Sequence, residues 1–177
     1  MFGFSRELLI ELRTLIKELG EQGGLVSPSV YDTAHILRVC PPVEGVEPGI
    51  KWLLAQQHPD GGWGVPTVPS ARDIPTLAAL LTLHTYRHLF AVDDVIEAGL
   101  AFLRAQAAQW MSIHIDLVPI AGEMILPYLL DEAERIGLSI DRTPYALLFE
   151  LRRIKLKYLD GQPLAPNSPP TYSWEAL

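Results

Sequence analysis

The 177-residue sequence has a single cysteine, no long uninterrupted apolar run and fewer basic than acidic residues. One thiol, Cys40, cannot form an internal disulfide, and we expect it to fill the core rather than to act as a nucleophile. No stretch reaches the ~18 consecutive apolar residues that a membrane-spanning helix needs, so we expect no transmembrane segment. Charged residues interrupt the apolar N-terminus, which argues against an export signal. Together these absences predict a cytoplasmic protein.

The balance of charge is acidic, with 14 Lys and Arg against 21 Asp and Glu and a net charge of −7. A protein that binds nucleic acid needs a basic surface to neutralise phosphates, so we expect no nucleic-acid partner. Hydrophobic residues make up 49% of the sequence, which is enough to bury a sizeable apolar core in one domain. Any anionic substrate must therefore be held by a local group of basic side chains.

Apolar residues recur at helical spacing in seven segments, and no segment alternates apolar and polar residues for the length of a strand. The expected helices cover about 5–19, 27–39, 48–57, 73–88, 93–109, 122–136 and 143–158. The first has the apolar stripe Leu8, Leu12, Leu15 and Leu19. Short connections rich in glycine and proline favour antiparallel neighbours. The sequence therefore predicts an all-α chain of antiparallel α-hairpins that form part of an α/α barrel.

Four residues are expected to shape the helix boundaries. Ser27, Asp73 and Asp93 precede or begin apolar segments, and their side chains suit N-caps. Pro127 falls inside the sixth segment, where it removes a backbone donor. We expect it to kink that helix or to split off its first turn.

The stretch WLLAQQHPDGGWG, Trp52–Gly64, joins the end of a helix to a glycine-rich turn. The Gln57 amide can bond both to free carbonyls at the end of its own helix and to amides at the start of a neighbouring helix. Asp60 with Gly61 suits a tight turn. The Trp63 ring can cover the preceding helix. None of these side chains is a good acid, base or nucleophile. We therefore expect Trp52, Gln57, Asp60, Gly61 and Trp63 to form a structural clasp, the name used below for Trp52–Gly64.

The clasp resembles the QW motif of the triterpene and class II diterpene cyclases, which are α/α barrels. Three further stretches resemble elements of copalyl diphosphate synthase-like diterpene cyclases. They are SPSVYDTAHILRV (27–39), similar to SxYDTAW; VPIAGEMILPYLLDEAERIGL (118–138), similar to PxGFExxFPxLLExAxxLxL; and LRRIKLKYLD (151–160), similar to KxxLKLKxIP. The four stretches occur in the family's order over most of the chain. The resemblance implies a terpene cyclase γ-like domain.

Class II diterpene cyclases protonate geranylgeranyl diphosphate and close a bicycle while the diphosphate survives. In that family the acid is the central Asp of a DxDD motif, and this sequence has neither DxDD nor the DDxxD motif of metal-assisted ionisation. The resemblance therefore implies an N-terminal, non-catalytic portion that is inactive alone. It would need a catalytic β-type domain, on the same chain or a separate one.

The resemblance also divides the sequence. Residues 1–40 match lead-in helices that associate with the β domain in relatives, 41–161 match the γ-type helical domain, and 162–177 read as a proline-rich linker with the truncated start of a further element. We expect either an excised piece or a naturally split gene product. An isolated chain with an uncovered interdomain face is expected to form a homo-oligomer, with the Leu8–Leu19 stripe as the pairing surface.

Four charged residues match family positions and are candidates for contacts with the substrate diphosphate or with the adjoining domain. Glu123 matches the Glu of GFE, Lys155 and Lys157 match the lysines of LKLK, and Arg72 matches an Arg of the family's Mg²⁺-linked segment. An ordinary surface ion pair between Glu123 and Lys155 is the alternative.

Metal sites have little support in the sequence. The Mg²⁺-linked segment reads PSARDIPTLAA here, with Ser70 and Ala71 where the family has acids, although Asp73 could compensate. His84 and His88 have the i, i+4 spacing of a zinc pair but no evident third ligand. We expect no cofactor in this chain, while the resemblance allows Mg²⁺ in a complete enzyme.

Two other functions stay open at this stage. The chain can be an all-α interaction module that binds a separate catalytic domain or itself through the same apolar face. It can also be an unrelated helical carrier of isoprenoid lipids. A neighbouring reading frame with a DxDD motif would favour the cyclase.

Overall fold

The computed structural model describes residues 10, 11, 13–15 and 28–160, and over these ranges every regular element is a helix. The prediction of an all-α chain is therefore confirmed. In chain order the elements are α2 (Val30–Val39), α3 (Glu47–Ala55), η1 (Pro69–Ala71), α4 (Asp73–Tyr86), α5 (Asp93–Met111), η2 (Ile115–Leu117), α6 (Gly122–Arg135), η3 (Thr143–Tyr145) and α7 (Ala146–Leu159). Most of the expected helix 5–19, with its pairing stripe, and the linker 162–177 lie outside the described residues.

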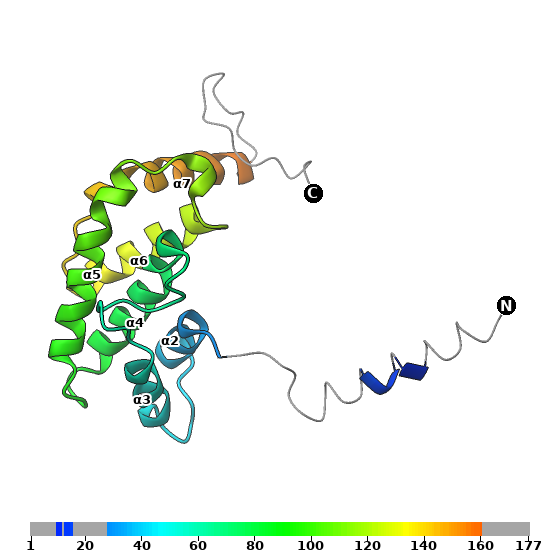
Figure 1. Cartoon of the computed structure of the whole chain (residues 1–177), viewed down its shortest axis with the longest axis vertical. Coiled ribbons are helices and arrows are strands. Elements are labelled where there is room, and N and C mark those ends of the chain that lie inside the picture. The colour runs from blue at the N-terminus through cyan, green and yellow to red at the C-terminus, as the bar shows by residue number, and fades with distance from the viewer. Residues whose placement is uncertain (1–9, 12, 16–27, 161–177) are drawn as a thin grey trace.

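Helix α4 is the centre of the fold, with α2, α5 and α6 packed around it (Figure 1). Every residue from Thr76 to Leu83 is buried, so this helix is apolar all round rather than on one side. Two polar groups of α4 fix the position of α2. The Thr82 hydroxyl donates to the Ala34 carbonyl at 2.9 Å, and the Tyr86 hydroxyl donates to the Leu37 carbonyl at 2.6 Å.

Helices α6 and α7 form an antiparallel hairpin that packs on α4 through α6. The 3₁₀ turn η3 leads into α7 and contacts α5, so it joins this hairpin to the other side of the molecule. In Figure 1 the helices follow an open arc, with α5 along one edge and α7 across one end. The described residues therefore supply part of a barrel rather than a closed one.

The expected helix caps were wrong in detail. Ser29, not Ser27, caps α2, and its hydroxyl accepts from the Asp32 amide at 3.0 Å. The cap positions of α4 and α5 are Arg72 and Val92, and neither caps with its side chain. The turn η1 already brings the backbone into a helical conformation before α4, so Asp73 becomes the first helical residue.

Pro127 lies inside α6, which remains one continuous helix from Gly122 to Arg135. The first turn is therefore not split off. Cys40 also differs from expectation, because it follows the last residue of α2 and is exposed rather than part of the core.

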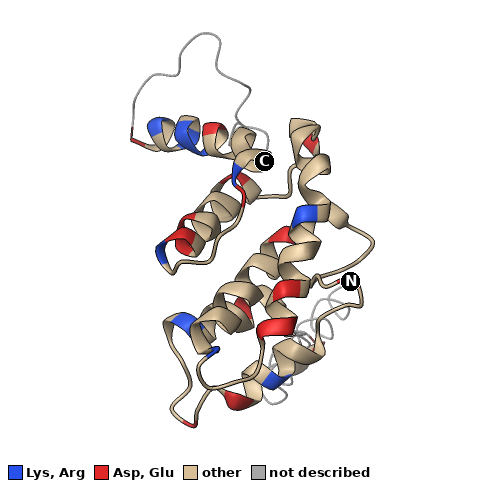
Figure 2. Cartoon of the chain, turned by 90° about the vertical axis from the view of Figure 1, so that its left-hand side faces the viewer, with Lys and Arg blue, Asp and Glu red and all other residues tan. Residues whose placement is uncertain are grey.

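Charged residues lie mainly on the outer surfaces of the helices. In the view of Figure 2 several basic positions lie close together on α7, and elsewhere on this side they alternate with acidic ones. Among the described helices, none has the length and apolar character that crossing a membrane requires.

Candidate functional site

Trp63 is the centre of the clasp, where its side chain is fully buried. Its indole Nε1 donates to the Leu53 carbonyl of α3 at 2.7 Å, and its amide donates to the Thr76 hydroxyl of α4 at 3.0 Å. One aromatic residue thus connects two helices through both its ring and its backbone. Trp52, also expected in the clasp, is only half-buried and packs at the margin of the core.

Gln57 joins the clasp to α5. Its amide Nε2 donates to the Gly61 carbonyl at 2.9 Å and to the Val95 carbonyl at 3.0 Å, rather than to carbonyls of its own helix. Gly61 has a φ of +88°, and a Cβ placed there would lie 2.2 Å from the Ala98 carbonyl oxygen. Only glycine lets the turn approach the α5 backbone this closely.

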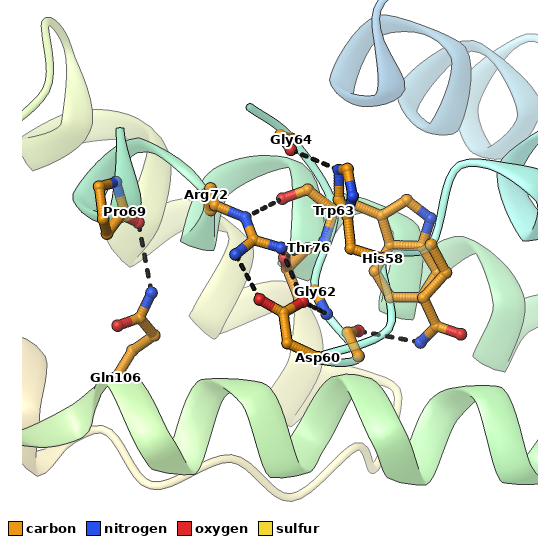
Figure 3. Close-up of polar contacts among 11 residues, drawn as sticks. His58, Asp60, Gly62, Trp63, Gly64, Pro69, Arg72, Thr76 and Gln106 are labelled. Carbon is orange, nitrogen blue, oxygen red and sulfur yellow. Dashed lines mark hydrogen bonds and ion pairs between the residues drawn. The ribbon is translucent and has the colours of Figure 1, made fainter. Parts of the chain in front are cut away.

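Arg72 lies outside the clasp in the sequence but binds two of its residues, Asp60 and Trp63. Figure 3 shows the guanidinium between Asp60, which it contacts at 2.6 and 2.8 Å, and the Trp63 carbonyl, to which Nε donates at 3.2 Å. Its Cζ also lies 4.5 Å from the centre of the Phe102 ring. With its side chain 5% exposed, Arg72 has almost no open surface for a diphosphate. This predicted contact residue instead stabilises the fold.

The hydrogen bond from Arg72 holds the pKa of Asp60 at about 2, below its ordinary 3.8. Because the folded-state pKa is the lower one, this carboxylate stabilises the fold fully above pH 4 and loses that contribution as the pH falls towards 2. Asp60 is half-exposed, so we expect only about 1 kcal/mol.

Asp60→Asn should therefore melt below the wild type at pH 5 and at nearly the same temperature at pH 2. Thermal unfolding by circular dichroism at a series of pH values measures this difference. Glu97→Gln, which removes the exposed Glu97–Arg104 pair, is the control and should change little at any pH. A wild-type advantage that stays constant down to pH 2 would show that the Asp60 charge is not involved.

Glu123 and Lys155 meet in the structure, which both a site near the diphosphate and an ordinary ion pair allow. Lys155 Nζ in α7 lies 2.5 Å from Glu123 Oε1 in the first turn of α6. The Glu123 side chain is 11% exposed and that of Lys155 is 32% exposed, so the lysine keeps access to solvent. Lys157 is exposed, but two residues further along a helix it points to a different side. The structure thus brings together two of the four predicted contact residues.

The chain on either side of this pair exposes large apolar residues. They are Leu117 and Ile120 before α6, and Leu156 and Leu159 in α7. Ile120 is 98% exposed at a turn that the Gly122 amide closes by donating to the Pro119 carbonyl at 2.7 Å. Ala121 follows with a left-handed φ of 61°, a conformation that costs energy in a residue other than glycine. Such a turn suits contact with another surface.

The histidine pair has no metal-site geometry. His84 is half-buried in α4, whereas His88 lies beyond the end of that helix and is exposed. Across the described ranges, no group of three or more His, Cys, Asp or Glu side chains is placed to hold a metal ion.

Asp73 is fully buried, which does not suit the role of replacement Mg²⁺ ligand. The indole Nε1 of Trp110 and the hydroxyl of Tyr145 each donate to its Oδ2 at 2.7 Å. Burial raises the pKa of Asp73 to about 6, against the lowering effects of these two donors and of Arg72. Sequence reasoning missed this cluster because its partners lie 37 and 72 residues away and form no local pattern.

An apolar groove of about 700 Å³ lies between the start of α2 and the loop that follows the clasp. Tyr31, His58, Val65 and Val68 are among its lining residues, and none of the four predicted contact residues lines it. The groove and the Glu123–Lys155 pair are therefore separate features.

Comparison with known proteins gives strong sequence matches. The chain is 39% identical over 184 residues to a (+)-kolavenyl diphosphate synthase of Herpetosiphon aurantiacus, covering 96% of this chain and 35% of that protein. It is 31% identical over 166 residues to a bifunctional levopimaradiene synthase of Ginkgo biloba, covering 89% of this chain and 18% of that protein. The chain thus spans about a third or less of the length of these relatives. No protein-family model matches the sequence.

A solved structure, abietadiene synthase from Abies grandis, matches with a TM-score of 0.62 and 30% sequence identity. The match covers 83% of this chain and 21% of that protein. The helices described above therefore have the arrangement found in part of a terpene cyclase.

Proposed function

We propose that this chain, a homologue of one segment of the diterpene cyclases, is the non-catalytic γ-type portion of a class II cyclase. The observation that carries the proposal is the relationship to a (+)-kolavenyl diphosphate synthase over 96% of the chain. That relative's name states a diphosphate product. The proposed reaction of the complete enzyme is protonation and cyclisation of geranylgeranyl diphosphate to a bicyclic diphosphate.

The catalytic acid of this reaction has to come from another domain. Protonating an alkene needs a carboxylic acid kept neutral by its surroundings and open to the substrate. Among the described residues, Asp73 has a carboxyl group whose pKa is raised by burial. Its side chain is enclosed by Trp110 and Tyr145, so it is not open to a substrate. We therefore assign the acid to a β-type domain, in the same chain or a separate one, that packs against residues 41–161. Residues 162–177 and the part of 1–40 that precedes α2 are assigned to the connections between the two, since α2 itself packs on α4.

Lys155 is the residue to which we assign the diphosphate. It is a flexible point charge of the kind that binds phosphate groups, and Glu123 holds its ammonium group at 2.5 Å. The exposed Lys157 adds positive potential at the same end of α7. The exposed apolar side chains before α6 and in α7 suit contact with the catalytic domain, which would exclude water from the site. We assign no cofactor to this chain, and any Mg²⁺ of the complete enzyme would enter with the diphosphate.

The role of Lys155 can be tested in a chimera. In this chimera the chain replaces the matching segment of the Herpetosiphon aurantiacus relative. Lys155→Ala should raise the KM for geranylgeranyl diphosphate about tenfold or more, because it removes one charge-assisted contact. Arg153→Ala in the same helix is the matched control, since Arg153 pairs with Glu150 on the exposed surface. Steady-state kinetics decides the question. An active chimera in which both variants have the same KM would remove Lys155 from the substrate site.

A further inference from the structure

Three parts of the fold meet at the Asp73 carboxyl group. Asp73 begins α4, Trp110 is near the end of α5, and Tyr145 ends η3. Both aromatic side chains are about 2% exposed, and their rings pack at 5.4 Å between centroids. A single carboxyl oxygen, Oδ2, accepts the hydrogen bonds from both. The cluster is therefore a junction between the α4–α5 pair and the segment that leads into α7.

This junction precedes the helix that carries Lys155. Tyr145 is followed directly by α7, and Lys155 lies ten residues further along the same continuous helix, about 15 Å along its axis. The rest of α7 packs on α6. How firmly η3 is held against α4 and α5 thus affects the start of the helix that presents the lysine.

The junction is unusual because its central group is a buried carboxyl group whose hydrogen-bonding capacity is only partly used. The second oxygen, Oδ1, is buried and has no hydrogen-bond partner. The groups that act on Asp73 are Trp110 from α5, Tyr145 from η3 and Arg72 just before α4, and each favours the charged form. Burial opposes them and prevails. Tyr145 stays protonated, since burial and the nearby Asp73 and Asp141 raise its pKa far above the ordinary value.

We propose that Asp73 is a positioning residue, and that the charge of its carboxyl group sets how firmly η3 and the start of α7 are held against α4 and α5. The ionised carboxylate gains hydration whenever the junction opens, whereas the neutral acid gains much less. Opening is therefore more frequent when Asp73 is ionised. The proposal rests on the proposed function only for the role of Lys155, because the junction exists whatever the substrate.

The direction of the pH dependence follows from linkage. In the closed junction the pKa of Asp73 is about 6, above the ordinary 3.8, so the closed form binds a proton more tightly than the open form. Stability of the junction should rise as the pH falls through 6 and should level off below 4. The separation of about two pKa units limits the change in the closed-to-open ratio between high and low pH to about a hundredfold.

Hydrogen exchange of the intact chain, followed by NMR, tests the proposal. Protection factors are measured for the Tyr145 amide and the first turn of α7, with the amides of α3 as the internal reference. In the wild type the junction amides should gain about tenfold protection relative to α3 between pH 7.5 and 5.0. The Trp110 indole N–H resonance should titrate with the same midpoint, near pH 6.

Two variants should change the junction in opposite directions. Asp73→Asn, which is neutral and of the same size, should show at pH 7.5 at least the protection that the wild type reaches at pH 5.0, without further pH dependence. Tyr145→Phe removes one donor and should lower junction protection about tenfold at pH 7.5. A residue with a merely structural role would lose protection in both variants.

The proposal fails if Asp73→Asn loosens the junction as Tyr145→Phe does, or if Trp110 titrates while the α7 amides show no matching change. Should Asp73→Asn not fold, the wild-type titration alone decides. All these measurements are made without substrate or catalytic domain. An inactive chimera would therefore contradict the proposed function and leave this result standing.

Discussion

Trp63→Ala should lower the free energy of unfolding by about 4 kcal/mol, because replacing a fully buried tryptophan by alanine typically costs 3–5 kcal/mol. The substitution also removes the donor at 2.7 Å from the Leu53 carbonyl, which is then left buried without that partner. For a chain of this size we expect a fall of roughly 8–16 °C in melting temperature. Chemical denaturation followed by circular dichroism measures the change.

Trp52→Ala is the matched control, since it makes the same change in a half-buried residue of α3. It should cost clearly less than Trp63→Ala. Equal effects of the two variants would mean that Trp63 has no special position, and the clasp would lose its main support.

Gly61→Ala should destabilise the fold by about 2–5 kcal/mol through a different cause. An alanine at a φ of +88° pays roughly 1–2 kcal/mol for the left-handed conformation. Its Cβ would also lie 2.2 Å from the Ala98 carbonyl oxygen, so the turn and α5 must move apart at a further cost of about 1–3 kcal/mol. The displacement should weaken the Gln57 bond to the Val95 carbonyl as well.

Gly137→Ala separates these two costs. Gly137 has a φ of +76°, but no atom lies within 4 Å of a Cβ built there, so only the conformational cost applies. The difference in unfolding free energy between the two variants therefore measures the approach of the turn to α5. If both variants lose the same amount, the close contact with Ala98 does not exist in solution.

Helical spacing of apolar residues was enough to predict each α-helix between Val30 and Leu159, but not the 3₁₀ turns η1 and η2. Long, strongly periodic segments specify a helix whatever their neighbours, because one face must be buried. Their ends were less predictable. A side-chain cap needs a residue outside the helix with extended backbone, and the turn η1 put Asp73 inside α4 instead.

The contacts of the candidate site likewise include some that the sequence could predict and some that it could not. The structural role of Trp63 could be inferred from a short local pattern, whereas the partners of Gln57, the Gly61 and Val95 carbonyls, could not. The pairing of Glu123 with Lys155 came from the resemblance to diterpene cyclases. The bonds from Arg72 to Asp60 and from Tyr145 to Asp73 join residues 12 and 72 positions apart. Such contacts depend on how helices pack, and no local spacing signals them.

We propose above that this chain supports a class II cyclisation without supplying the catalytic acid. The most direct test of this proposal is product extraction after incubation with geranylgeranyl diphosphate, using the chain alone, the remaining portion of the Herpetosiphon aurantiacus relative alone, and the two together. We predict no cyclised product from the chain alone and a bicyclic diphosphate from the mixture. Cyclisation by the chain alone, at a rate comparable to that of a complete cyclase, would contradict the account.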